Sequence, residues 1–256
     1  MRRAAILLAA CLAAPAVAQE NVTVTGAGPN CVGSIDAAHY EGPTTRYAHG
    51  VLGDAVEWER LTVTVGSNGT CAWGTSQMSV TLPDHRVFED TEPRLADLDG
   101  DGMNEVITVE SSVKLGARVT VWGVRDGEFG RVATTPFIGQ RNRWLAPVGA
   151  ADLDGDGYVE IAYVDRPHLA RTLRVWRFQG GKLTEVASNP GLTNHRIGQD
   201  FISGGIRDCG QGPEMITVDG NWSRVVASRF SDGRIASRDI GPFRGQGDLK
   251  KALSCR

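Results

Sequence analysis

The segment ADLDGDGMNEVI at residues 96–107 decides the fold, because it recurs almost unchanged as ADLDGDGYVEIA at residues 151–162. Two weaker copies flank this pair, LGDAVE at residues 52–57 and IRDCGQGPEMI at residues 206–216. Each copy ends in or contains a glutamate that repeats about every 50 residues: Glu57, Glu105, Glu160 and Glu214. A constant period of this length is typical of proteins built from repeated structural units.

The sequence that follows each glutamate also repeats. Short runs rich in β-branched residues follow Glu105 at residues 106–110, 118–124 and 131–135. The corresponding runs lie at 161–165, 173–178 and 183–187 after Glu160, at 215–219, 224–230 and 235–239 after Glu214, and at 61–65 and 78–82 after Glu57. Hairpin-type dipeptides separate the last two runs of each unit: Asn68-Gly69, Asp126-Gly127, Gly180-Gly181 and Asp232-Gly233. A run before each loop, such as residues 144–150, supplies a further strand. The pattern predicts an all-β, β-propeller-like array of about four blades, each with three to four antiparallel strands.

The N-terminal part of the mature chain leaves the number of blades open. Residues 21–40 begin with the strand-like Val22-Thr23-Val24-Thr25 but lack the loop signature. This segment either completes the last blade by pairing with C-terminal strands or forms part of a fifth blade. A stack of sheets that does not close into a ring is the alternative. No long amphipathic helix is expected.

The two strong copies carry carboxylates at positions 1, 3, 5 and 9 of a nine-residue loop. Four acidic side chains this close repel one another unless a cation neutralises them. Ca²⁺ suits such a loop because it takes six to eight oxygen ligands, whereas Mg²⁺ prefers to keep several waters. The sequence therefore predicts two calcium sites, in which residue 7 contributes its backbone carbonyl. Their ligands are Asp97, Asp99, Asp101, Met103 and Glu105 in the first loop and Asp152, Asp154, Asp156, Tyr158 and Glu160 in the second.

An EF-hand is the competing interpretation of these loops. It requires a bidentate glutamate at position 12 and a helix on each side. Position 12 is Thr108 in one loop and Tyr163 in the other, and both lie in strand-like runs. The weak copies around Glu57 and Glu214 lack most ligands, so we expect those sites to be empty.

These loops, followed by β-strands, resemble the FG-GAP/VCBS repeats of integrin-α-type β-propellers. The resemblance extends over about residues 46–240, and the whole chain is similar to small exported FG-GAP repeat proteins of alphaproteobacteria. It implies that Ca²⁺ binds within a blade through the ligands named above. Integrin-type propellers usually have seven blades, so a chain with about four units leaves ring closure and any inherited binding face open.

The N-terminus has the organisation of a secretory signal peptide at residues 1–18. Arg2 and Arg3 precede an uncharged run, which ends in Ala16-Val17-Ala18 before Gln19. The run of residues 4–18 is shorter than the ~20 residues that a membrane helix needs. We expect an exported, periplasmic or extracellular protein whose residues 19–256 form a single domain. An N-terminal anchor helix, or lipid attachment at Cys11 in the lipobox-like Leu8-Ala9-Ala10-Cys11, are the alternatives.

Cysteine usage agrees with export. Four cysteines remain after Cys11, and an even number in an exported chain indicates two disulfides. Of the three possible pairings we favour Cys31–Cys71 and Cys209–Cys255, because each pair lies within one end of the chain.

Charge and motifs limit the possible functions. Lys and Arg number 27 and Asp and Glu number 30, for a net charge of −3, so no basic surface for nucleic acid is expected. The histidines, His39, His49, His85, His168 and His195, form no known metal motif, and no nucleophile elbow or phosphate loop is present. We interpret them as loop residues, although His168 and His195 are placed to line one face.

The tryptophans offer recognition surfaces. Trp122 and Trp176 occupy the same place in two units and are predicted core residues. Trp58, Trp73, Trp144 and Trp222 are less regular, and exposed ones would stack on sugars or peptides. The sequence predicts a calcium-stabilised binding or interaction module, a monomer without a membrane span, whose ligand is a protein or a carbohydrate. The alternative is a periplasmic hydrolase or lyase acting on carbohydrates or phosphoesters, which a convergent cluster of His, Asp and Arg would favour.

Overall fold

The structure, a computed structural model, describes residues 22–23, 33–66 and 76–256. The predicted signal peptide, the lipid-attachment alternative at Cys11, the Cys31–Cys71 disulfide, the Asn68-Gly69 turn and Trp73 lie outside the described residues.

Repeated antiparallel units account for most of the described chain, as the sequence predicted. The second unit contains β6 (Arg94–Ala96), β7 (Glu105–Ser112), β8 (Gly116–Arg125) and β9 (Glu128–Thr134). The third contains β10 (Leu145–Ala151), β11 (Glu160–Asp165), β12 (Thr172–Gln179) and β13 (Lys182–Pro190). The fourth contains β15 (Gly205–Asp208), β16 (Pro213–Asp219), β17 (Arg224–Ser231) and β18 (Arg234–Pro242), with β14 (Leu192–Thr193) also paired to β16.

The first unit is joined to the second in one sheet. It contains β1 (Val22–Thr23), β2 (Ile35–Thr44), β3 (Glu57–Val65) and β4 (Ser76–Thr81), and β5 (Arg86–Phe88) pairs with both β3 and β7. β1 pairs with β4 through Val22 opposite Val80. The N-terminal strand therefore belongs to the first unit, and the expectation that it pairs with C-terminal strands or begins a fifth blade was wrong.

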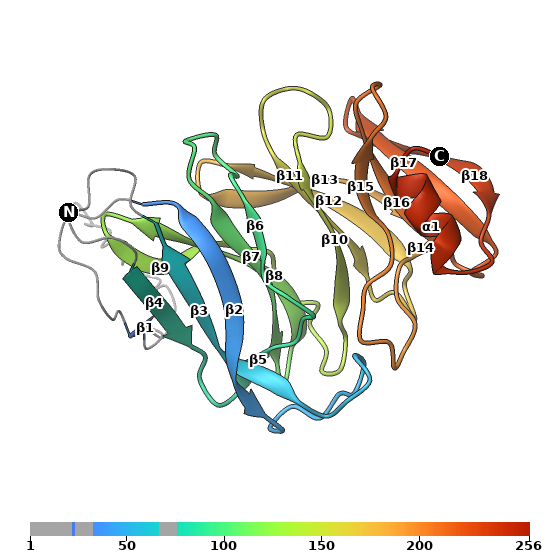
Figure 1. Cartoon of the computed structure of the whole chain (residues 1–256). Helices are drawn as coiled ribbons and strands as arrows, with labels where there is room; N and C mark the ends of the chain where they lie inside the picture. Colours follow the sequence, from blue (N-terminus) through green and yellow to red (C-terminus); the bar gives the residue numbers. More distant parts are fainter. Residues whose placement is uncertain (1–21, 24–32, 67–75) are drawn as a thin grey trace, which may run out of the picture.

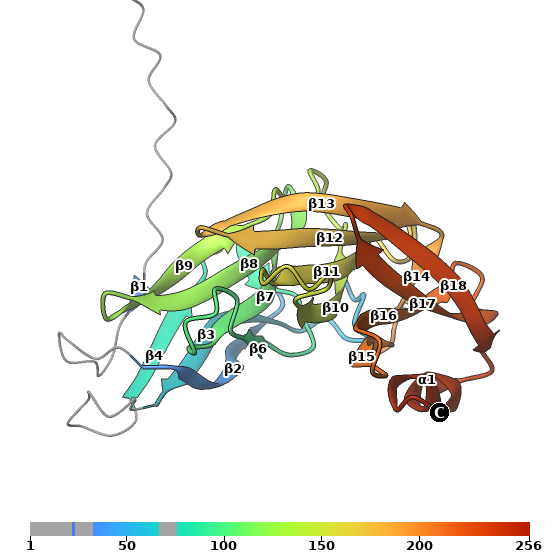
Figure 2. The same cartoon turned by 90° about the horizontal axis from the view of Figure 1, so that it is seen from above.

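The four units follow one another along an arc (Figures 1 and 2). Contacts run from β2 to β6, from β6 to β10 and from β10 to β15 on the inner side of the arc. On the outer side they run from β4 to β9, from β9 to β13 and from β13 to β18. In Figure 2 the first unit and the fourth unit lie at opposite ends of this arc. The architecture is all-β and propeller-like in its blades, without the closed ring of a propeller among the described residues.

Apolar cores fill the space between successive sheets. Between the first and second units, Leu61, Val63 and Val80 pack with Trp122 and Phe129. The interface of the second and third units buries residues that include Val119, Val121, Ile161, Tyr163 and Phe178, and that of the third and fourth buries residues that include Val164, Val175, Met215, Val226 and Phe230. Every residue of β7 and β11 is buried because a neighbouring sheet covers each face.

The two ends of the array are finished differently. On the outer face of the first unit the cross-strand pairs are polar: Arg60 with Thr81, Thr62 with Ser79, and Thr64 with Gln77. On the outer face of the fourth unit, helix α1 (Gln246–Leu253) covers Ile216, Val218, Val225 and Ala227 with Leu249 and Ala252. A repeat array whose terminal faces are polar or covered needs no ring closure to bury its apolar surface.

Helix α1 was not expected from the sequence. It has only eight residues, of which Leu249 and Ala252 are buried, so its apolar pattern is too short to stand out. Among the described residues, no helix combines the length and apolar character that crossing a bilayer requires.

The first unit runs in the opposite direction from the others. The start of β2 lies beside the end of the loop that precedes β7, where Asn104 donates a side-chain hydrogen bond to the carbonyl of Ile35. Glu57 therefore begins β3 at the far end of the array from Glu105, although the sequence placed the two at equivalent positions. The prediction that Glu57 and Glu105 occupy equivalent positions was wrong, because a short pattern of Gly, Asp and Glu contains no information about the direction of the strand that follows it.

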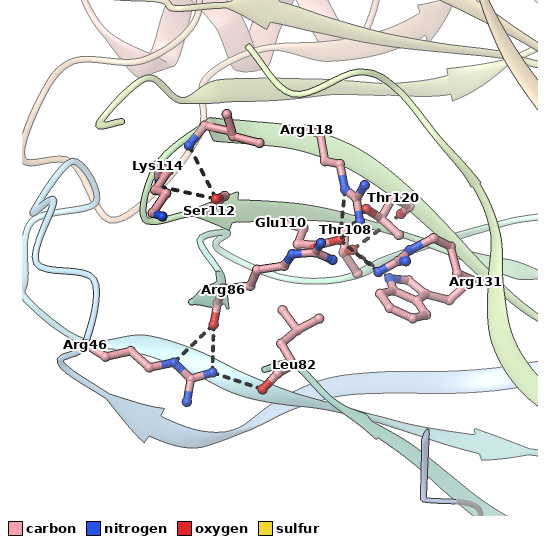
Figure 3. Close-up of polar contacts among 12 residues, drawn as sticks. Arg46, Leu82, Arg86, Thr108, Glu110, Ser112, Lys114, Arg118, Thr120 and Arg131 are labelled. Atoms are coloured by element: carbon pink, nitrogen blue, oxygen red, sulfur yellow. Dashed lines mark hydrogen bonds and ion pairs between the residues drawn. The ribbon is translucent and has the colours of Figure 1, made fainter. Parts of the chain in front are cut away.

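A buried carboxylate with arginines around it stabilises the second unit (Figure 3). Glu110 on β7 accepts hydrogen bonds from Arg86 at 2.9 Å, Arg118 at 2.7 Å and the Thr120 hydroxyl at 2.9 Å. Arg46 donates to the carbonyls of Leu82 and Arg86, and so connects the segment after β2 to the strand that bridges the two units.

Cys209, which follows β15, forms a disulfide with Cys255, which follows α1, and their Cα atoms lie 5.7 Å apart. This confirms the predicted pairing. The bond attaches the helix to the unit that it covers.

Replacing both cysteines (Cys209→Ser with Cys255→Ser) should lower the free energy of unfolding by about 2–4 kcal/mol, because the unfolded chain then regains the freedom of a 46-residue loop. Urea denaturation of the two proteins without reductant measures the difference. An unchanged midpoint would show that packing alone holds the helix in place.

Candidate functional site

The first acidic loop, residues 97–104, connects β6 to β7 and is closed by its own carboxylates. Asp97 accepts hydrogen bonds from the backbone amides of Gly100 at 2.8 Å and Gly102 at 2.9 Å. Gly100 and Gly102 have φ angles of 74° and 83°, which glycine adopts without strain. The fully buried Glu105 accepts the amide of Leu98 at 3.0 Å. The loop is therefore folded back so that its acidic side chains gather on one side.

The second acidic loop, residues 152–159, repeats this geometry between β10 and β11. Asp152 accepts from Gly155 at 2.8 Å and from Gly157 at 2.9 Å, and Glu160 accepts the amide of Leu153 at 2.9 Å. The two loops lie at the same end of the array, which we call the acidic end; the second loop is at the top of Figure 1.

One arginine forms hydrogen bonds with the carboxylates of each acidic loop. Arg125 donates to Asp99 at 2.9 Å and to Glu105 at 2.7 Å. Arg177 contacts Asp154 at 2.8 Å and Glu160 at 2.6 Å, and it also pairs with Asp156. A single guanidinium balances one of the four carboxylate charges in each loop, so an excess of negative charge remains at both.

The donor set suits a hard cation. Carboxylate oxygens of Asp97, Asp99 and Asp101 lie within 4.8 Å of one another, as do those of Asp152, Asp154 and Glu160. In the second loop, Asp154 also has a buried oxygen, Oδ1, without a hydrogen-bond partner. The structure thus gathers three of the four predicted acidic ligands in each loop. Glu105 and Asp156 lie outside these groups and pair with arginines.

Burial affects the two loop glutamates in the same way. Desolvation raises the pKa of Glu105 and of Glu160, although hydrogen bonds from the backbone and from an arginine oppose the shift. Each charged carboxylate therefore depends on its cationic partner.

The two weak copies have different surroundings. Glu214 forms ion pairs with three arginines, Arg207, Arg229 and Arg238. Although burial opposes it, hydrogen bonds from Arg207 and Arg238 lower the pKa of Glu214. Burial, with Glu89, Asp54 and Asp90 nearby, raises the pKa of Glu57 to about 9. That neither copy binds a cation stays a prediction.

A pocket of about 320 Å³ lies at the opposite end of the strands. Connections from all four units contribute to it, and we call this the pocket end. The residues that line it are His49, Val51, Asn142, Arg143, Trp144, Arg166, His168, Leu169 and Ile197. None of these carries a hydroxyl or thiol group.

His49 lines one wall of the pocket, and the buried Glu89 lies behind it. Nδ1 of His49 lies 2.5 Å from Oε1 of Glu89, which is fully buried and also accepts a hydrogen bond from the Ser111 hydroxyl. The indole of Trp144 donates to the backbone carbonyl of Glu89 at 2.7 Å. His49 is thereby held in one orientation by groups from the first and second units.

His168 lines a second wall, and the fully buried His195 lies behind it. The carbonyl of Gln199 accepts a hydrogen bond from Nε2 of His195 at 2.9 Å, and Nε2 of His168 lies 3.0 Å from Nδ1 of His195. Desolvation lowers the pKa of His195, and desolvation together with the neighbouring His195 lowers that of His168 to about 4. Both rings are therefore neutral at pH 7. His195 must donate through Nε2, so His168 donates to it and keeps Nδ1 as an acceptor.

One residue of the pocket wall has an unusual backbone conformation. Arg166 has a φ of 45°, a value that residues other than glycine rarely adopt, whereas the φ of 54° at Asn142 is one that asparagine tolerates. The rim is apolar, since Leu169 is 63% exposed and Ile197 is 71% exposed.

The sequence identified only part of this pocket. His168 and His195 were predicted to be able to line one face. His168 lines the pocket, whereas His195 is fully buried behind it, and His49 was not distinguished from loop histidines. Trp122 is fully buried, as predicted, and Trp144 is 2% exposed at the base of the pocket. No spacing in the sequence connects His49 with His168, because they come from loops of different units.

Comparison with known protein families gives one match. Residues 90–163, which contain both acidic loops, match the family model for an FG-GAP-like repeat. A search of curated proteins finds no significant match.

The neutral histidine pair should be visible by NMR. We expect His168 to titrate near pH 4, because burial disfavours its charged form. Folding lowers this pKa below the unfolded value of 6.5, so the unfolded chain binds more protons between about pH 4 and 6.5. The free energy of unfolding should therefore fall by roughly 1 kcal/mol from pH 7 to pH 5, after allowing for solvent screening of the half-buried ring.

His168→Gln is the matched variant, because an amide can still donate to His195. It should lose the acid-shifted resonance and show a smaller stability loss on acidification. A midpoint for His168 near 6.5 would contradict the geometry.

Proposed function

Because this chain carries an FG-GAP-like repeat at residues 90–163, we propose that it is an exported, calcium-stabilised interaction module. The array is propeller-like, and its loops meet at two opposite ends. The acidic end would bind calcium for structural purposes, and the pocket end would bind a ligand. The observation that carries the proposal is the convergence of carboxylates in two loops of the same geometry.

Calcium would act by fixing the connection between the first and second strands of a unit. In each loop it would bind to carboxylates that would otherwise repel one another. The residues that would hold it are Asp97, Asp99, Asp101 and Glu105, with the carbonyl of Met103, and Asp152, Asp154, Asp156 and Glu160, with the carbonyl of Tyr158. Since the unfolded chain has no such site, binding would add directly to folding stability.

Export is supported by two features. The first is the signal-like sequence of residues 1–18, and the second is the disulfide between Cys209 and Cys255, a bond that persists in oxidising compartments. A periplasmic or extracellular location also supplies the calcium concentrations that such loops use in other extracellular modules.

A second candidate function, a hydrolase or lyase, is favoured by one observation, the His49–Glu89 pair at the pocket. A carboxylate that orients an imidazole is a common arrangement for a general base. We rank it second because no lining residue provides a nucleophilic hydroxyl or thiol, so the histidine would have to activate water.

Calcium should raise the melting temperature of the purified protein. Saturation of one site at about a hundred times its dissociation constant adds about 2.7 kcal/mol, so two sites add about 5.4 kcal/mol, which corresponds to roughly 11–22 °C for a domain of this size. Calorimetric titration of chelator-treated protein should detect two sites. No bound calcium, together with an unchanged melting temperature in EGTA, would contradict the proposal.

Single substitutions should separate the two sites. Asp99→Asn and Asp154→Asn should each abolish one site and remove about half of the calcium-dependent stabilisation. Asp126→Asn, in an exposed hairpin turn with a φ of 53° that asparagine tolerates, is the control and should keep both.

Mass spectrometry of the protein recovered from the exporting host tests the N-terminus. We expect a mature chain that begins at Gln19, since cleavage follows Ala18. A chain that begins at Cys11 and carries lipid would establish the anchored alternative instead.

A further inference from the structure

The pocket end combines a positive charge with apolar surface. In the part of the chain that the structure describes, Arg143 forms no ion pair, and its guanidinium donates only to the neighbouring carbonyl of Asn142 at 2.9 Å. The other arginine of the pocket, Arg166, makes a two-point contact with Asp165 at 2.8 and 2.9 Å. Asp165 also accepts from Arg174, which in turn pairs with Glu185, so the two arginines are balanced by two carboxylates. Arg143 is therefore the cation of the pocket that remains available to a ligand.

An unused acceptor lies next to this cation. Oδ1 of Asn142 is buried and has no hydrogen-bond partner. The residue itself is fixed, because its backbone amide donates to the Tyr47 hydroxyl at 3.1 Å and its φ is 54°. A buried polar atom without a partner costs stability unless a ligand or water satisfies it. A ligand N–H group would do so.

Apolar side chains from three different units complete the site. Val51, Leu169 and Ile197 line the pocket, and the last two are mostly exposed to solvent. Ile197 comes from a loop that is held against the first unit, where Gly198 donates its amide to the carbonyl of Val51 at 3.0 Å. These side chains would lose contact with water when a hydrocarbon group fills the space between them.

We propose that this pocket binds an α-amido carboxylate with an apolar side chain, the chemistry of a peptide C-terminus or an N-acyl amino acid. Arg143 pairs with the carboxylate, Asn142 accepts the amide N–H, and Val51, Leu169 and Ile197 contact the side chain. The pocket volume of about 320 Å³ accommodates one or two residues.

This inference deepens the proposed binding role and rests on it, but its test does not depend on calcium binding. Full-length protein, saturated with calcium, is titrated by calorimetry with acetyl-Ala-Leu, with the same peptide as its C-terminal amide, and with N-acetyl-leucine. The acid should bind about tenfold or more tightly than the amide, since a charge-assisted hydrogen bond is lost in the amide. Tighter binding of the dipeptide than of N-acetyl-leucine identifies a peptide end as the ligand, and equal binding identifies the free N-acyl amino acid.

Three variants assign the roles of the residues. Arg143→Gln should weaken binding of the acid about tenfold and should leave the amide unaffected. Asn142→Gly retains the positive φ but lacks the acceptor, and should weaken both ligands severalfold. Arg141→Gln removes an exposed neighbouring charge that does not line the pocket, and it should bind like the wild type.

The results separate this inference from the calcium proposal. A protein that binds two calcium ions but discriminates poorly between acid and amide, or whose affinity survives Arg143→Gln, overturns the pocket assignment alone. Absence of binding at millimolar peptide does the same. Discrimination between acid and amide in a protein that binds no calcium supports the pocket assignment and overturns only the metal sites.

Discussion

A buried glutamate at the start of the second strand is the constraint on which each acidic loop depends. Glu105 and Glu160 each accept the amide of a leucine seven residues earlier, so the loop must return to the strand that follows it. Leu98 and Leu153 are then buried beneath the loops. One oxygen of each glutamate accepts the backbone amide and the other accepts a hydrogen bond from an arginine, so the end of each loop is fixed. The geometry of each acidic loop and that of the strand after it thus depend on the same glutamate.

The repeated units could be predicted because their turns depend on residues close together in the sequence. The direction of the first unit and the composition of the pocket could not be predicted, because they depend on contacts between distant parts of the chain. Glycines such as Gly155 and Gly157 at positive φ, and hairpin dipeptides such as Asp232-Gly233, act within a few residues and are readable in the sequence. The reversed first unit is different, because its direction depends on β2 lying beside the loop before β7. The pocket depends on loops from four units, so no spacing between His49, His168 and Arg143 could indicate it.

The two ends of the array have opposite character. Three carboxylates of each acidic loop gather at one end, and the other end holds a pocket lined by Arg143, His49 and His168, with exposed Leu169 and Ile197 at its rim. The strands of the second and third units connect the two ends, and β7 and β11 are buried throughout. Ordering of the acidic loops would therefore support the strands whose far ends carry the pocket walls, without any contact between metal and ligand.

The polar face of the first unit and the helix over the fourth have an evolutionary consequence. Since both terminal surfaces are already shielded from water or suited to it, an extra internal blade inserted by duplication would meet complementary apolar neighbours on each side. Related proteins could therefore gain or lose whole internal blades and remain soluble, because the first unit and the terminal helix would still shield the two ends without contacting each other.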